Sequence, residues 1–275
     1  MPNQPRALVV RAPGTNCDAE LCRAFAMAGA NPDLVHLDAL CDAPSAIDEF
    51  DLIGFPGGFS YGDDVASGRI FAMRTREKLL PHLLAAAERG TPMIGVCNGF
   101  QVLAQCGLVP GWPEQQTGGS RQLLAVTHNQ GGRFVDTWTG MVPDPDGSCL
   151  WTRGLDAYAD LAPQTLMYPS AHGEGRFVAS DAVVIDRLVS GGQIPLRYAD
   201  NFNGSEAAIA GVCDPSGRVF GLMPHPERYL DWNRHPWWTR LPAEVRRGPT
   251  PGLRIFLNAV EAVAAQPRPH AAAAR

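Results

Sequence analysis

The segment that decides the fold is Pro92-Met93-Ile94-Gly95-Val96-Cys97-Asn98-Gly99. It begins as an apolar run typical of a buried strand and passes through Gly-x-Cys-x-Gly. Residues 100–105 then follow, with a pattern that predicts a helix. A strand that turns sharply into a helix around one reactive residue is a nucleophile elbow. Glycines two residues before and after Cys97 leave the space that such a turn requires. The sequence therefore predicts an α/β fold with Cys97 at a strained turn, next to a helix N-terminus that favours thiolate.

The residues that precede this turn alternate between β-rich and helical patterns. Because strands that alternate with helices form parallel sheets, we expect an α/β fold of the flavodoxin-like type. It would be a doubly wound, mostly parallel sheet with helices on both faces. The expected strands are 7–10, 34–37, 51–55 and 92–96, and the expected helices are 19–28, 69–89 and 100–105.

The pattern after Gly107 is more β-rich and predicts an added antiparallel portion. Two β-like runs, 123–126 and 133–135, flank Gly131-Gly132 and indicate a hairpin. Further expectations are a loop at 141–148, strands at 182–185, 196–198, 207–212 and 219–223, and a helix at 251–264. We expect one domain over residues 1–265 and a disordered tail over residues 266–275.

Composition excludes several classes of protein. The 275 residues carry a net charge of −5, which argues against nucleic acid as the main partner. No apolar run is long enough to span a membrane, and there is no secretory start, so we expect a cytoplasmic protein. The seven cysteines form no C-x-x-C pair, which fits a reducing compartment. We expect six of them to be buried and structural: Cys17, Cys22, Cys41, Cys106, Cys149 and Cys213.

A second informative segment is Met223-Pro224-His225-Pro226-Glu227. Each proline disfavours helix for the residue before it, so we expect His225 and Glu227 in extended backbone with side chains on the same side. The carboxylate can then orient the imidazole, which takes the proton of Cys97 and later returns it. The remaining histidines are interpreted as surface residues: His36, His82, His128, His172, His235 and His270.

The run Phe55 to Asp64, Phe-Pro-Gly-Gly-Phe-Ser-Tyr-Gly-Asp-Asp, follows an expected strand. Such loops cluster at the carboxyl edge of a doubly wound sheet, beside the elbow. Backbone N–H groups of Gly57 or Gly58, with that of Asn98, can therefore stabilise an oxyanion. No phosphate-binding loop, dinucleotide fingerprint or zinc motif occurs, so we expect no cofactor and no metal in this chain.

Two further segments stay without an assigned role. Ala171-His172-Gly173-Glu174-Gly175-Arg176 can be a solvated loop or a binding or interface element. The stretch 228–247 combines arginine with tryptophan, which fits either a partner surface or packing into the core.

Together the motifs resemble class I glutamine amidotransferases. Cys97 in its turn and His225-Pro-Glu227 carry the resemblance to the class. The Gly-Gly-Phe-Ser-Tyr-Gly-Asp and His172-Gly-Glu-Gly-Arg segments are similar to glutaminase subunits of phosphoribosylformylglycinamidine synthase. After that aspartate, residues 64–69 depart from the common small-subunit form. The chain also looks longer than a minimal subunit.

The resemblance implies a division of roles. Cys97 attacks the glutamine carboxamide and forms a thioester, His225 is base and then acid, and Glu227 orients it. Gln101 matches a substrate-contacting position, and Gly57 or Gly58 with Asn98 supplies oxyanion N–H groups. Ammonia then passes to a separate synthetase subunit that uses ATP and Mg²⁺, and a third small subunit is implied. The alternatives are an amidotransferase of another pathway and a non-catalytic regulatory module on the same fold.

Overall fold

The structure is a computed structural model that describes residues 4–116 and 122–265. Among these residues, nine strands form one sheet in the order β2-β1-β3-β4-β11-β10-β9-β6-β7. The first five strands in this order, β2-β1-β3-β4-β11, run parallel to one another, and the remaining pairings in the sheet are antiparallel. A separate two-stranded sheet joins β5 and β8. The predicted α/β class, with its added antiparallel portion, is confirmed.

The strands and helices have the following bounds. The strands are β1 Arg6–Arg11, β2 Asn31–His36, β3 Leu52–Phe55, β4 Met93–Val96, β5 Leu124–His128, β6 Val135–Pro143, β7 Met167–His172, β8 Glu174–Ala179, β9 Leu196–Tyr198, β10 Ile209–Cys213 and β11 Val219–Leu222. The helices are α1 Asp18–Met27, α2 Leu37–Asp42, α3 Arg69–Lys78, α4 Leu80–Glu88, α5 Asn98–Gln105, α6 Pro113–Gln116, α7 Asp156–Leu161, α8 Ala182–Ser190 and α9 Pro251–Ala264. None of the helices in the described ranges is long and apolar enough to cross a membrane.

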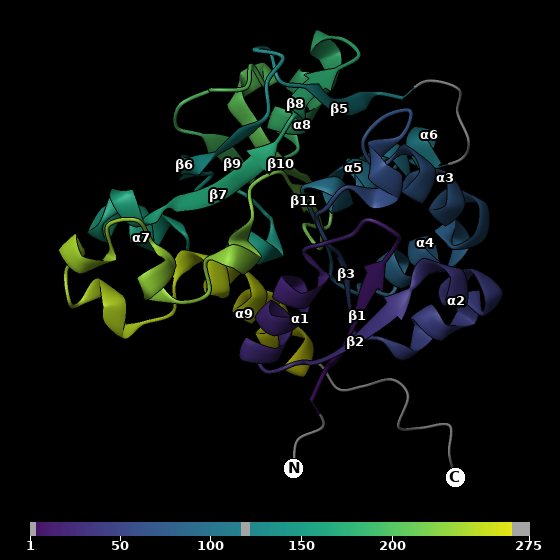
Figure 1. Ribbon diagram of the computed structural model, residues 1–275, viewed down its shortest axis with the longest axis horizontal. Helices are drawn as coiled ribbons and strands as arrows, with labels where there is room; N and C mark the ends of the chain where they lie inside the picture. Colours follow the sequence, from purple (N-terminus) through teal and green to yellow (C-terminus); the bar gives the residue numbers. More distant parts are fainter. Residues whose placement is uncertain (1–3, 117–121, 266–275) are drawn as a thin grey trace.

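The parallel half of the sheet lies between two groups of helices. Helices α1 and α9 lie on one side of it, and α2 to α5 lie on the other (Figure 1). The central strands are apolar along their whole length, as β3, β4 and β11 have only buried residues. This is expected of strands covered on both faces.

The carboxyl ends of the parallel strands position the site. β1, β3, β4 and β11 are consecutive neighbours in the sheet, so the loops that follow them meet along one edge. Those loops carry Cys17, Gly57, Cys97 and His225, respectively. Ligands of doubly wound sheets bind outside this edge, where the chain leaves the strands.

The predicted hairpin around Gly131-Gly132 is wrong. β5 pairs with β8, and β6 pairs instead with β7 and β9 in the main sheet. The local turn signal is real, since the Gly132 N–H donates to the Asn129 carbonyl, but it does not choose the partner strand. The loop predicted at 141–148 begins later, because β6 runs to Pro143.

Two helical assignments also differ from the prediction. Residues 182–185 were expected to form a strand, but they start helix α8, where the Asp181 side chain accepts a hydrogen bond from the Val184 N–H. The helix predicted over 69–89 is divided into α3 and α4 near Leu79. Pro81 lies in the first turn of α4, and because proline has no N–H it cannot continue the hydrogen-bond ladder of α3. The predicted tail at 266–275 lies outside the described residues.

Candidate active site

Cys97 occupies the predicted strained turn between β4 and α5. Its backbone has φ 52° and ψ −108°, a conformation that residues other than glycine rarely adopt. It is the N-cap residue of α5, so the positive end of that helix lies at the residue that carries the thiol. The side chain is nearly buried and lines an open cavity. These features confirm the elbow predicted from the sequence.

The glycines on either side of Cys97 are sterically required. A Cβ atom at Gly95 would lie 2.5 Å from the carbonyl oxygen of Gly99. A Cβ atom at Gly99 would lie 1.9 Å from the carbonyl oxygen of Phe55. Either contact is far shorter than a van der Waals distance, so larger residues would force the elbow open.

The pairing of β4 with β11 brings His225 to Cys97 across 128 positions of sequence. Val96 is paired with Leu222 in parallel register, and the Cys97 N–H donates to the Leu222 carbonyl at 2.7 Å. The chain then continues through Met223 and Pro224, and the His225 N–H donates to the Pro169 carbonyl at 2.7 Å. Both reactive residues therefore leave adjacent strands at the same edge.

His225 and Glu227 form a buried pair. Nδ1 of His225 lies 2.6 Å from Oε1 of Glu227, and the two side chains are 2% and 0% exposed. Burial opposes the charged imidazole, but the charges of Glu227 and Cys97 raise the pKa of His225 well above its ordinary value. The contact between the two side chains agrees with the prediction, but the backbone does not. Pro226–Arg228 form a 3₁₀ turn rather than an extended strand.

Gly57 lies next to both the imidazole of His225 and the side chain of Cys97. A Cβ atom at this position would lie 2.8 Å from Cε1 of His225 and 3.3 Å from Cβ of Cys97. The nearby Cys97 side chain is one of the groups that raise the pKa of His225. The structure thus brings together the three residues predicted to be catalytic.

The remaining predicted site residues surround this group. Gly58 and Gln101 line the same cavity as Cys97. Gln101 is held by two hydrogen bonds, accepting from Asn98 Nδ2 at 2.9 Å and donating to the Glu174 carbonyl at 2.7 Å. The role of Gly57, Gly58 and Asn98 as oxyanion donors stays a prediction.

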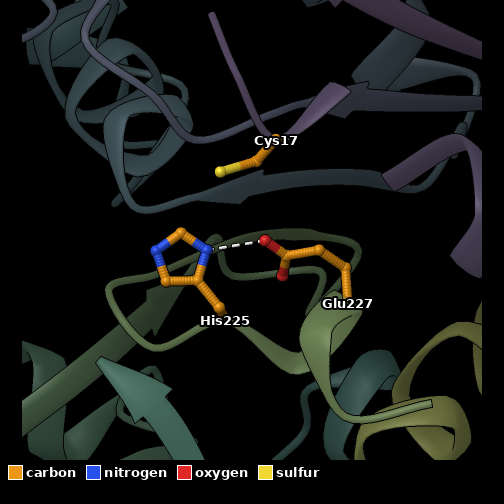
Figure 2. A group of neighbouring side chains, drawn as sticks. All are labelled: Cys17, His225 and Glu227. Carbon is orange, nitrogen blue, oxygen red and sulfur yellow. Dashed lines mark hydrogen bonds and ion pairs between the residues drawn. The ribbon is translucent and has the colours of Figure 1, made fainter. Parts of the chain in front are cut away.

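Sequence reasoning missed the position of Cys17. It is buried, as predicted, but it also lines the cavity. Its sulfur accepts a hydrogen bond from Nη2 of Arg228 at 3.0 Å and lies beside the His225–Glu227 pair (Figure 2). The only signal for this in the sequence is that Cys17 follows the first strand. Cys22 and Cys41, expected to be buried, are only half-buried.

Cys17, His225 and Glu227 could in principle share a metal ion. One ligand atom from each lies within 4.8 Å of the others, in the part of the chain that the structure describes. However, the guanidinium of Arg228 already contacts the sulfur, and Nδ1 of His225 is already paired with Glu227. This arrangement already places a positive charge beside the sulfur, and it fits a hydrogen-bonded network better than a cation site.

Two histidines predicted to lie on the surface are buried. His172 is 3% exposed and His235 is 1% exposed. His235 packs among the rings of Trp138, Tyr229 and Trp237, and its Nε2 lies 2.8 Å from the Gln164 carbonyl. Part of the tryptophan-rich stretch therefore packs inside the molecule, although Trp237 and Trp238 remain partly exposed.

The segment Ala171–Arg176 contributes one wall of the cavity. Ala171, His172, Gly173 and Glu174 all line it. Arg176 points elsewhere and donates to the Gly204 carbonyl at 3.0 Å. The segment is therefore no solvated loop: it is the end of β7 and the start of β8, joined at Gly173.

Comparison with known proteins agrees with this geometry. The family model of the CobB/CobQ-like glutamine amidotransferase domain matches residues 4–263. The chain is 40% identical to phosphoribosylformylglycinamidine synthase subunit PurQ of Dehalococcoides mccartyi, over 93% of this chain and 96% of that protein. It is 36% identical to the PurQ subunit of Treponema denticola, over 82% of this chain and 88% of that one.

A solved structure supports the same relationship. A chain in the structure of PurLQS from Thermotoga maritima has a TM-score of 0.69 and 30% sequence identity, covering 95% of this chain and 100% of that chain. A glutamine amidotransferase of Thermotoga maritima, at 15% identity and a TM-score of 0.50, shares the fold. The chain therefore belongs to the glutamine amidotransferase family and, within it, to the PurQ subunits of phosphoribosylformylglycinamidine synthase.

Proposed function

We propose that Cys97, His225 and Glu227 hydrolyse the side-chain carboxamide of glutamine. The observation that carries the proposal is the meeting of three groups at one sheet edge. The elbow presents Cys97, the β4–β11 register delivers His225, and Glu227 holds the imidazole at 2.6 Å. Nucleophile, base and orienting carboxylate are the parts that covalent acyl transfer requires.

Acylation begins with the thiol proton on the imidazole. Burial lowers the pKa of His225, but the charges of Glu227 and Cys97 raise it well above its ordinary value. The raised pKa favours an imidazolium beside a thiolate. The sulfur attacks the carboxamide carbon, and the carbonyl oxygen becomes an oxyanion. Backbone N–H groups of Asn98 and of Gly57 or Gly58 stabilise it. The imidazolium then gives its proton to the nitrogen, the C–N bond breaks, and ammonia leaves.

Deacylation uses the same groups in the opposite sense. His225 takes a proton from water, the hydroxide attacks the thioester carbon, and the sulfur leaves as thiolate. The products are glutamate and a regenerated Cys97. Glu227 holds the imidazole in one orientation and one tautomer through both steps.

The charges of the cavity suit an amino acid substrate. The residues that line it include three acidic ones, Asp63, Asp136 and Glu174, together with the basic Arg228. Free glutamine carries both an ammonium and a carboxylate, and each can find an opposite charge on this wall. Gln101, fixed by its bonds to Asn98 and Glu174, supplies a further polar contact.

The family places this chemistry in purine biosynthesis. The chain is a glutaminase subunit that supplies ammonia for the amination of formylglycinamide ribonucleotide. Its partners are a synthetase subunit and, as the name PurLQS of the Thermotoga maritima complex indicates, a third component. We place the ATP and Mg²⁺ of the amination on the synthetase, and the assembly in the cytoplasm.

The test is an assembled complex supplied with either glutamine or an ammonium salt. We expect Cys97→Ala to abolish glutamine-dependent amination while ammonium-dependent amination stays at the wild-type rate. Full glutamine-dependent activity in this variant would overturn the proposal.

A further inference from the structure

His172 has its hydrogen-bonding state fixed by its neighbours. The side chain of Asn129 donates through Nδ2 to the carbonyls of Arg133 at 2.9 Å and His172 at 2.8 Å. Its Oδ1 accepts the N–H of Gly175 at 3.2 Å and lies 3.1 Å from Nδ1 of His172. Because Oδ1 can only accept, Nδ1 of His172 carries the hydrogen. The other ring nitrogen, Nε2, is left with a free lone pair.

That lone pair is buried and has no partner among the described residues. His172 is 3% exposed, and no hydrogen bond reaches its Nε2. Burial, and to a lesser extent the charge of His225, lowers the pKa of His172 to about 4. The ring is therefore a neutral acceptor at neutral pH. Buried acceptors without partners are rare in folded proteins, and each one calls for an explanation.

The place of His172 suggests what the missing partner is. It lines the same cavity as Cys97 and His225. It directly follows Ala171, whose carbonyl oxygen lies 4.0 Å from the sulfur of Cys97. His172 thus belongs to the wall beside the nucleophile, where a substrate would be cleaved.

The reaction leaves one group on the substrate without an assigned partner. In the proposed reaction the carbonyl oxygen accepts from the backbone N–H groups of Asn98 and of Gly57 or Gly58, and the lone pair of the nitrogen takes the proton of His225. The N–H hydrogens of the departing nitrogen are left without an assigned acceptor. A neutral imidazole can accept from them. Because its pKa is low, the ring stays unprotonated at neutral pH and has no proton on Nε2 to give to the ammonia that forms.

We propose that Nε2 of His172 accepts a hydrogen bond from the leaving nitrogen of the glutamine carboxamide and holds it as ammonia forms. This inference rests on the glutaminase function proposed above. It makes His172 a further catalytic residue, specific to the acylation step and to a leaving group that carries N–H.

Two variants separate this role from a structural one. In His172→Asn the shorter amide can still donate to Asn129, but no atom remains at the position of Nε2. In His172→Gln the longer amide places a polar atom near that position. Both are assembled with the synthetase and the third subunit, and glutamate release is measured with glutamine and with the γ-methyl ester of glutamate. The ester forms the same thioester but releases methanol, whose oxygen carries no N–H.

We expect His172→Asn to lower kcat/KM for glutamine at least about 10-fold, the loss of one hydrogen bond in the transition state. Its kcat/KM for the ester should stay within about twofold of wild type, with His172→Gln intermediate on glutamine. An equal loss on both substrates, or no loss on glutamine, would overturn the inference. Cys97→Ala serves as the separate control, because its full activity on both substrates would instead refute the glutaminase function itself.

Discussion

Nδ1 of His225 and Oε1 of Glu227 lie 2.6 Å apart although only Pro226 separates the two residues in sequence. The 3₁₀ turn formed by Pro226–Arg228 folds the carboxylate back onto the imidazole, and both side chains are almost completely buried. In such a place an ionised carboxylate is stabilised mainly by the charge and hydrogen bond of its partner. The pair therefore sets the orientation and the basicity of the imidazole that acts on Cys97.

The first prediction concerns Glu227→Gln. Removing the carboxylate charge removes the largest contribution that favours the imidazolium, so the pKa of His225 should fall. We expect kcat for glutamine hydrolysis to drop by about 100-fold or more, within the range of general acid–base effects. A pH–rate profile of the assembled complex measures both changes. Asp231→Asn is the matched control, since Asp231 pairs with Arg23 at the surface. A variant with more than half of wild-type kcat would contradict the role of Glu227.

The second prediction concerns Gly57, which lies next to the imidazole of His225 and to Cys97. A methyl group at Gly57 would lie 2.8 Å from Cε1 of His225, so Gly57→Ala must displace the ring. We expect a folded protein whose glutaminase activity is reduced at least about 10-fold, because small misplacements of catalytic groups are costly. Gly131→Ala is the control, as nothing lies within 4 Å of a Cβ there. Circular dichroism verifies folding. Wild-type activity in Gly57→Ala would contradict this prediction, because it would show that a methyl group fits beside the imidazole of His225 without displacing it.

A third prediction follows from the neutral state of His172. Its pKa is lowered from 6.5 to about 4, chiefly by burial. Between these two pH values the unfolded chain binds more protons than the folded chain, so the free energy of unfolding falls as the pH is lowered. The contribution is at most about 3 kcal/mol.

The measurement is denaturant unfolding of wild type and His172→Asn at pH 7, 5.5 and 4. We expect the variant to lose less stability than wild type across this range, whatever its stability at pH 7. Parallel pH dependence of the two proteins would mean that His172 does not titrate as its environment indicates.

The parts of the fold predicted from sequence are those set by local patterns. The elbow is recognisable because the turn has no space for a side chain at Gly95 or Gly99, and both glycines lie within two residues of Cys97. The central strands are recognisable because both of their faces are buried, which leaves unbroken apolar runs. Residues 251–264 were predicted as a helix and form α9 with the same bounds.

The parts not predicted depend on contacts between distant residues. β5 pairs with β8 and not with its sequence neighbour β6, a choice made by the surrounding sheet and not by the Gly131-Gly132 turn. Residues 182–185 favour a strand by composition, but the Asp181 cap and the burial of Val184 and Leu188 make them a helix. The four-residue spacing of Val184 and Leu188 places both on one face of a helix, and this spacing is a stronger signal than the strand-like composition.

The same distinction applies to the site. His225 and Glu227 were predicted because their spacing and prolines are local features. Cys17 and His172 could not be assigned to the cavity, because each is brought there by the sheet order and by partners such as Arg228 and Asn129 far away in sequence. A cysteine or histidine without a local motif gives no signal of such a position.

The most direct test of the central claim is covalent trapping of the nucleophile. The chain has seven free cysteines, so the unreactive ones serve as internal controls. The assembled complex is treated with a diazoketone analogue of glutamine, with and without excess glutamine, and the modified peptide is identified by mass spectrometry. The account predicts one label per chain, on Cys97, suppressed by glutamine and greatly slowed in His225→Ala. Labelling of Cys17 in its place, or failure to label Cys97 in the active complex, would contradict it.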